Sequence, residues 1–211
     1  FYPHPDLSKL KNRIKAYVDI THSPEPAVLN ESTEECGWHG TMTTVVCAGD
    51  GYLSNGLYKG IASDAELVLL KVQNAEGKIT RQNIENALQW VLDYHTRYNI
   101  RIVNVSLGDD TVVSHTVSKI DLLAEQLIEK GISIIAAAGN NEQAGSKPPA
   151  NAPNVITVGG IDDHNDLSYE GVHEYHSTYG ATIDGFMKPE LVANAIWLAA
   201  PILPGTDAFE E

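Results

Sequence analysis

Two short apolar runs, Ile100-Arg-Ile-Val-Asn-Val-Ser106 and Ile132-Ser-Ile-Ile-Ala-Ala-Ala138, decide the fold, because an amphipathic stretch lies between them. Short runs rich in β-branched residues are typical of buried strands. The stretch between them, from about Val113 to Lys130, is predicted to be a helix that ends before Gly131. Its apolar stripe consists of Ile120, Leu123, Leu127 and Ile128. A strand, a helix and a strand in this order form a parallel βαβ unit.

The same alternation continues on both sides of this unit. Glu66-Leu-Val-Leu-Leu-Lys-Val72 predicts an earlier strand, and Thr80 predicts the N-cap of a helix through about Tyr98. The buried face of that helix is expected to contain Ile84, Leu88, Val91 and Leu92. A last strand is predicted over Asn154–Gly159. The predicted fold class is therefore α/β, a doubly wound and mainly parallel sheet with helices on both faces.

Composition narrows the classes of partner. The chain has 211 residues, enough for one domain with a core, and 43% of them are hydrophobic. Its 28 acidic residues against 14 Lys and Arg give a net charge of −14, which argues against nucleic acid and anionic membranes as partners. No apolar run reaches the ~20 residues that a bilayer requires, and the first residues do not form a signal peptide. Two cysteines make no disulfide framework, so a secreted and an intracellular location both stay open.

The histidine at position 39 is the first candidate for catalysis. It lies in Trp38-His39-Gly40-Thr41, at the predicted start of a short helix. A histidine there can present its ring to a cleft, with Gly40 leaving space beside the imidazole and Thr41 bonding locally. Taken alone, these residue types also fit an ordinary helix N-terminus. Cys47, about two turns further along, is expected to be a small core residue.

Two further segments follow predicted strands, where α/β sheets bind their ligands. Ala137-Ala138-Gly139-Asn140 ends on a side-chain amide that can donate to a developing oxyanion. Ser106-Leu107-Gly108 offers backbone that can pair with an extended peptide. Each segment alone also fits an ordinary turn after a strand.

In combination, these segments resemble the subtilisin-like serine proteases, and seven segments follow the family's order along nearly the whole chain. They are His4-Pro5-Asp6-Leu7, His39-Gly40-Thr41, Tyr58-Lys59-Gly60-Ile61-Ala62, Val105-Ser106-Leu107-Gly108, Ala137-Ala138-Gly139-Asn140, Pro153–Gly159 and Ser177–Leu191.

The resemblance implies a role for each segment. It implies that His39 is the general base and that the Asn140 side chain stabilises the oxyanion. The substrate, a peptide or protein held as an extended strand, would be bound by Ser106, Leu107 and Gly108 and by Gly77, Lys78 and Ile79. The P1 pocket would be lined by Ala137, Ala138 and Gly139. No cofactor is implied.

Two catalytic positions of the family have no counterpart in the sequence. There is no Asp-Ser/Thr-Gly turn, and Asp6 and Asp19 are expected to be structural or surface carboxylates. Gly205-Thr206-Asp207 is nearest to the family's Gly-Thr-Ser, but it lacks the serine. We therefore expect residues 1–211 to be an inactive fragment of a single subtilisin-like peptidase domain, without the catalytic-Asp strand and the nucleophile-Ser helix. Truncation would expose apolar surface, through which we expect the chain to self-associate.

Alternative functions differ in what the sequence offers them. A non-catalytic pseudoprotease that binds peptides stays open, because it would keep the segments after both strands. Dinucleotide binding is excluded, since Gly49-Asp50-Gly51 follows a predicted helix and lacks the third glycine. No metal site is predicted, because His173-Glu174-Tyr175-His176 lacks His-Glu-x-x-His spacing and no loop alternates oxygen ligands.

Overall fold

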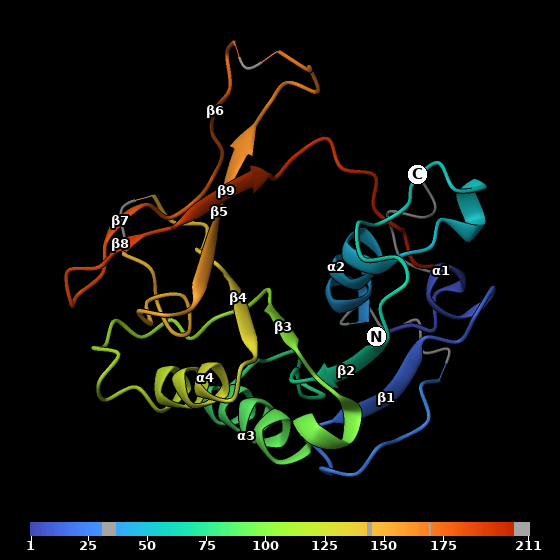
Figure 1. Cartoon of the computed structure of the whole chain (residues 1–211), viewed down its shortest axis with the longest axis horizontal. Coiled ribbons are helices and arrows are strands. Elements are labelled where there is room, and N and C mark those ends of the chain that lie inside the picture. The colour runs from blue at the N-terminus through green and yellow to red at the C-terminus, as the bar shows by residue number, and fades with distance from the viewer. Residues whose placement is uncertain (31–36, 143–144, 169, 205–211) are drawn as a thin grey trace. The chain divides into compact units, whose positions relative to one another are not determined.

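The computed structural model describes residues 1–30, 37–142, 145–168 and 170–204. The chain divides into two compact units, one formed by residues 1–79 with the segment from Ala199, the other by residues 80–198 (Figure 1). Among the described helices, none combines the length and the apolar character that crossing a bilayer requires.

The first unit is built on two parallel strands, β1 (Ile14–Asp19) and β2 (Leu67–Lys71). It also contains the short helix α1 (Pro5–Ser8), the helix α2 (Trp38–Ala48) and the 3-10 turn η2 (Tyr52–Ser54). Its core includes Leu7, Val18, Ala48 and Leu69, all buried.

The second unit contains a five-stranded, mainly parallel sheet. The strands β3 (Ile102–Val105), β4 (Ser133–Ala137) and β5 (Ile156–Asp162) pair in parallel and in this order. The strand β9 (Leu191–Asn194) pairs in parallel with β5, and the short β6 (His173–Glu174) pairs antiparallel with the end of β5. A separate small hairpin is formed by β7 (Gly180–Ala181) and β8 (Met187–Lys188).

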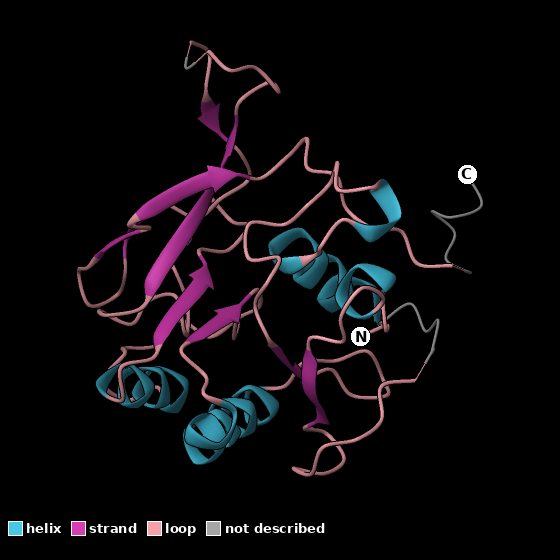
Figure 2. Ribbon diagram, turned by 45° about the vertical axis from the view of Figure 1, so that its right-hand side comes forward, coloured by secondary structure: helices cyan, strands magenta, loops and turns pink. Residues whose placement is uncertain are grey.

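Two helices lie side by side next to this sheet (Figure 2). The helix α3 (Arg81–Tyr98) begins as predicted, because the Thr80 hydroxyl accepts a hydrogen bond from the Asn83 N–H at 3.2 Å. It ends at Asn99 in the left-handed conformation. Three of the four predicted buried residues, Ile84, Leu88 and Val91, are buried, and Leu92 is half-buried.

The helix α4 (Lys119–Glu129) begins six residues later than the predicted start at Val113. The Ser118 hydroxyl caps it by accepting from the Asp121 N–H at 3.3 Å. The preceding residues form a turn in which the Val117 N–H donates to the Ser114 carbonyl. Local capping thus outweighs the apolar pattern on which the prediction depended. The predicted terminator, Gly131, has the positive φ of 80° that favours glycine.

The strand β5 runs three residues beyond the predicted end at Gly159. Glycine is unfavourable within strands, and β5 contains two, Gly159 and Gly160. The structure shows why glycines are there. A Cβ on Gly159 would lie 2.8 Å from the Pro189 ring, and one on Gly160 would lie 2.8 Å from the Tyr175 carbonyl oxygen. The missing side chains let neighbouring segments approach the strand closely.

Candidate active site

His39 is the second residue of α2 and its side chain is exposed. The Gly37 N-cap supplies no side-chain hydrogen bond, so the helix start is held by Thr41 instead. The buried Thr41 hydroxyl donates to the Gly37 carbonyl and accepts from the Tyr2 N–H, each at 2.8 Å. The local bond of Thr41 agrees with the sequence prediction, whereas the bond from Tyr2 was not anticipated.

The role predicted for Gly40 needs correction. Its missing side chain makes room for the Phe1 ring, because a Cβ on Gly40 would lie 2.8 Å from that ring. The residues that precede α1 thus pack on the first turn of α2. Cys47 is also placed differently from the prediction, since its side chain is exposed and it is not part of the core.

Asp6 lies in a network of structural hydrogen bonds. It is buried, and its carboxylate accepts from the Leu53 N–H at 2.9 Å. Its carbonyl accepts from the Arg13 guanidinium at 2.8 Å, and Arg13, itself buried, also donates to the Ala65 carbonyl at 3.2 Å. These bonds tie α1 to the segment before β2. Asp6 is therefore a structural carboxylate, which is one of the two roles expected from the sequence.

Asp19 ends β1 directly opposite Lys71, the last residue of β2. Its carboxylate accepts from the Lys71 ammonium at 3.0 Å and from the Thr21 N–H and hydroxyl. Burial acts to raise the pKa of Asp19, but these hydrogen bonds outweigh it and lower the pKa below its usual value. Asp19 thus stays ionised and pairs the ends of the two strands.

The Gly77, Lys78 and Ile79 segment forms the far side of a turn after β2. The Asn74 N–H donates to the Lys78 carbonyl, and the Lys78 N–H donates to the Asn74 side chain. The Gln73 amide donates to the Gly77 carbonyl at 2.8 Å. The turn is exposed, and hydrogen bonds within it hold its backbone.

Ser106, Leu107 and Gly108 follow β3, which lies at one end of the strand order of the second unit. The Asn104 amide donates to the Ser106 hydroxyl at 2.8 Å. A Cβ on Gly108 would lie 3.1 Å from the Pro148 carbonyl oxygen, which also accepts from the Asp109 N–H. This segment is thereby fixed against the loop that carries Pro148.

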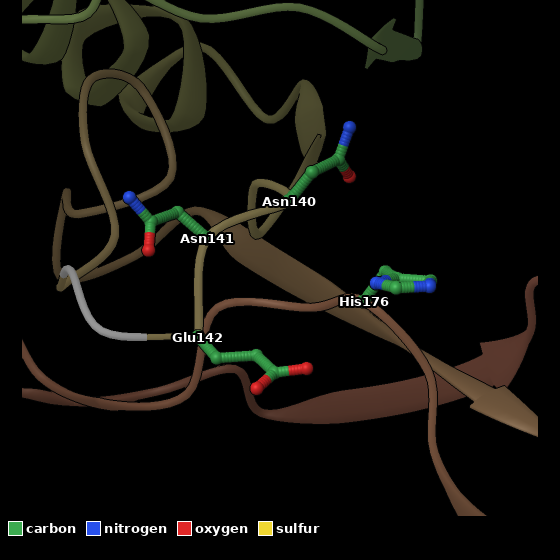
Figure 3. Close-up of a pocket in the computed structure, with 4 residues that line it drawn as sticks. All are labelled: Asn140, Asn141, Glu142 and His176. Carbon is green, nitrogen blue, oxygen red and sulfur yellow. The ribbon is translucent and has the colours of Figure 1, made fainter.

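Ala137, Ala138, Gly139 and Asn140 lie at the carboxyl end of β4. Asn140 is exposed and lines a shallow hollow of about 430 Å³ together with Asn141, Glu142 and His176. In Figure 3 the Asn140 and Asn141 amides point to different sides of the chain. The residues that line the hollow carry two amides, a carboxylate and an imidazole.

Thr178 holds this loop on both sides of Asn140, and sequence reasoning missed it. Its N–H donates to the Gly139 carbonyl at 3.0 Å. Its hydroxyl accepts from the Asn141 N–H at 3.2 Å and donates to the Asn141 carbonyl at 2.8 Å. Gly139 has a φ of 110°, and a Cβ there would lie 2.9 Å from the Thr178 hydroxyl oxygen. The only sequence signal was the position of Thr178 within a segment that resembles the family.

His39 belongs to the first unit and Asn140 to the second. Both side chains are exposed, and in each case a buried threonine, Thr41 or Thr178, holds the neighbouring backbone by hydrogen bonds. An exposed imidazole can exchange a proton with a substrate, and an exposed amide after a strand can donate to an anion.

Comparison with known proteins identifies the class. The family model described as the subtilase family, Peptidase S8, matches residues 1–202, so the chain belongs to the subtilase family. Serine protease AprX of Bacillus subtilis is 32% identical over 213 residues, which cover 95% of this chain and 46% of AprX. A thermophilic serine proteinase of Bacillus sp. strain AK1 is 28% identical, covering 87% of this chain and 40% of its own.

Solved structures agree with this assignment. Sphericase superposes with a TM-score of 0.70 at 25% identity, covering 96% of this chain and 65% of sphericase. S41 psychrophilic protease gives a TM-score of 0.69 at 25% identity, covering 91% and 62%. The predicted family and the mixed α/β fold with a mainly parallel sheet are thereby confirmed. The chain spans less than half of the length of each of the two curated relatives described above.

Proposed function

We propose that residues 1–211 are part of a single peptidase domain of a subtilase serine endopeptidase, which hydrolyses peptide bonds through an Asp-His-Ser triad. In this proposal His39 takes the proton from a serine hydroxyl and returns it to the leaving amine. The Asn140 amide donates to the oxyanion of the tetrahedral intermediate. The 211 residues contain no Asp-Ser/Thr-Gly turn and no Gly-Thr-Ser string. We therefore expect this chain by itself to hydrolyse no peptide, since no acyl-enzyme forms without the nucleophile.

The substrate is proposed to be a protein or peptide in extended conformation. Ser106, Leu107 and Gly108 continue a strand at one end of the sheet order, where added backbone can pair with them. The braced turn with Gly77, Lys78 and Ile79 supplies a second stretch of exposed backbone. Ala137, Ala138 and Gly139 would line the P1 pocket, where small side chains leave room for that of the substrate.

The observation that carries the proposal is the set of hydrogen bonds by which Thr178 holds the loop around Asn140. An oxyanion donor acts best when it is fixed before the reaction, because no reorganisation is then needed as charge develops. Hydrogen bonds from Thr178 hold the residue before Asn140 and the residue after it, while Asn140 itself stays exposed. This arrangement suits a preorganised donor better than an ordinary turn, which needs no such support.

The test compares the full-length protein that contains this chain with its His39→Ala and Asn140→Ala variants. A fluorophosphonate probe is expected to label the wild type and not His39→Ala, while His22→Ala, at an exposed histidine elsewhere, is labelled normally. Removing one side-chain donor from an oxyanion hole lowers kcat by about 10²–10³, a value measured in a subtilisin. We expect a loss of that order for Asn140→Ala with KM little changed.

The outcome separates the two candidate functions. A folded full-length protein that neither reacts with the probe nor cleaves a chromogenic peptide contradicts the protease proposal. Saturable binding of an extended peptide by that same protein would then establish the pseudoprotease. The 211-residue chain alone should cleave the chromogenic peptide no faster than its own His39→Ala variant.

A further inference from the structure

The end of β5 and the start of β6 bring together three side chains with metal-ligating atoms. Asp162 and His173 lie directly opposite each other in the antiparallel pair. His164 follows Asp162 by two residues in left-handed backbone, with a φ of 54°. One ligating atom from each of the three lies within 4.8 Å of the other two. The chain thus turns back on itself at a point where two imidazoles and a carboxylate converge.

The distances leave space for an ion. The Asp162 Oδ2 atom lies 3.8 Å from His164 Nδ1 and 4.0 Å from His173 Nε2. Both distances are too long for a hydrogen bond. Three ligands around one zinc ion at about 2.1 Å lie about 3.4–3.6 Å from one another. The two imidazoles are more than half exposed, so small rotations bring all three atoms to that spacing.

The carboxylate is held in the orientation that a ligand needs. The Asp162 Oδ1 atom accepts from the His164 N–H at 2.7 Å and from the Trp197 indole N–H at 2.9 Å. Its side chain is 12% exposed. With Oδ1 engaged on one side, Oδ2 is left facing both imidazoles.

The His173 ring has the support that is typical of a metal ligand. Its Nδ1 atom lies 3.2 Å from the Gly171 carbonyl oxygen. A proton on Nδ1 that is donated to this carbonyl leaves the Nε2 lone pair toward Asp162, which is the tautomer that binds a metal. The ring centroids of His164 and His173 lie 4.9 Å apart. The Nδ1 atom of His164 faces the same Asp162 carboxylate.

We propose that Asp162, His164 and His173 bind one Zn²⁺ ion through one oxygen and two nitrogen atoms, with the remaining position open to water. Imidazole nitrogen favours Zn²⁺ over Ca²⁺ or Mg²⁺, which take oxygen ligands. The ion fastens β6 to β5 at the segment that leads on to Thr178. A metal-ligand spacing within one segment does not predict this site, because Asp162 and His173 come together only when β5 and β6 pair.

The first test is calorimetric titration of the full chain with Zn²⁺ after treatment with a chelator. We expect one site with micromolar or tighter affinity. The double variant His164→Gln/His173→Gln should bind at least 100-fold more weakly, and Asp162→Asn at least tenfold more weakly. His22→Gln and Asp166→Asn, at exposed side chains outside the cluster, are the matched controls and should bind as the wild type does.

Two further measurements separate this site from binding to unfolded chain or to carboxylates alone. Zn²⁺ should raise Tm for the wild type and not for the double variant, since only a site in the folded state stabilises it. Co²⁺ in place of Zn²⁺ should give the visible absorption of a tetrahedral site. The proposal is wrong if the folded wild type binds no Zn²⁺, if the double variant binds it equally well, or if Ca²⁺ binds more tightly than Zn²⁺.

Discussion

The first turn of α2 and the loop after β4 each present one exposed side chain, His39 in the first unit and Asn140 in the second. In both regions a buried threonine hydroxyl makes two hydrogen bonds. Thr41 accepts from Tyr2 and donates to Gly37, while Thr178 accepts from and donates to the same residue, Asn141. Both hydroxyls join segments that are far apart along the chain.

The two regions differ in what else holds the backbone. His39 lies in the first turn of a helix, whose carbonyl groups accept hydrogen bonds from the next turn. Asn140 lies in a loop beyond the last strand residue, Ala137, and has no such ladder. Removing the Thr178 hydroxyl should therefore lower the free energy of unfolding more than removing the Thr41 hydroxyl does. Removing the hydroxyl in each region, by Thr178→Val and by Thr41→Val, tests this difference.

Thr178→Val keeps the shape of the side chain and removes both of its hydroxyl hydrogen bonds. The Asn141 peptide groups lose two hydrogen bonds, each contributing about 0.5–1.5 kcal/mol, so the free energy of unfolding should fall by about 1–3 kcal/mol. In the full-length protein we expect kcat to fall at least tenfold with a smaller change in KM, because the oxyanion donor is displaced. Thr178→Ser, which keeps the hydroxyl, should restore most of kcat. If Thr178→Ser and Thr178→Val lower kcat equally, the hydroxyl hydrogen bonds of Thr178 do not position the Asn140 loop.

Asp121 is a buried group of the second unit that responds to pH. It is fully buried at the start of α4, and burial raises its pKa to about 7. Because the folded state then holds the proton more tightly than the unfolded chain, this stabilisation is present at acid pH and is lost as pH rises from about 4 to about 7. Asp121→Asn should gain about 2–4 kcal/mol relative to the wild type between pH 4 and pH 8.

Urea unfolding at both pH values measures this gain, with Asp166→Asn, at an exposed carboxylate, as the control. The comparison between variant and wild type removes the contribution of the other acidic residues. A difference between the two proteins that stays constant from pH 4 to pH 8 would mean that Asp121 titrates normally in the folded chain.

Gly139→Ala tests the close approach of Thr178 to the loop. The new Cβ would lie 2.9 Å from the Thr178 hydroxyl, on backbone with a φ of 110°. Gly180→Ala is a matched control, because Gly180 has a φ of 114° with no atom within 4 Å of a new Cβ. Both variants carry the backbone strain of about 1 kcal/mol, and Gly139→Ala should lose about 1 kcal/mol more in urea unfolding. Equal losses would show that Thr178 moves aside freely.

Local signals explain which parts of the fold the sequence could predict. Thr80 and Gly131 act on their nearest neighbours, so the start of α3 and the end of α4 follow from residue type. The start of α4 depends on which of several polar residues caps it, and Ser118 does so. The length of β5 depends on partners at Pro189 and Tyr175, which a strand pattern does not reveal.

The candidate site shows the same division between local and distant contacts. His39 and Asn140 could be chosen from sequence because each stands at the end of an element, within a segment that resembles the family. The groups that hold them could not be chosen. Tyr2 meets Thr41 across 39 residues of chain, and Thr178 meets Asn141 across 37. The Asp162 and His173 pair depends in the same way on strand register.

Thr41→Val is expected to change the free energy of unfolding less than Thr178→Val, Asp121→Asn or Gly139→Ala does. The valine keeps the buried volume but removes both hydroxyl hydrogen bonds. As the N-cap carbonyl, that of Gly37 still accepts the first hydrogen bond of the helix, so the chief loss is the acceptor for the Tyr2 N–H. Tyr2 is half-buried, and water can replace part of that bond, which limits the cost to about 0.5–1.5 kcal/mol of unfolding free energy. Urea unfolding of Thr41→Val and Thr178→Val side by side measures the difference. If Thr41→Val proves the more destabilising, the helix start depends on the segment before α1, and the loop around Asn140 is the better supported of the two.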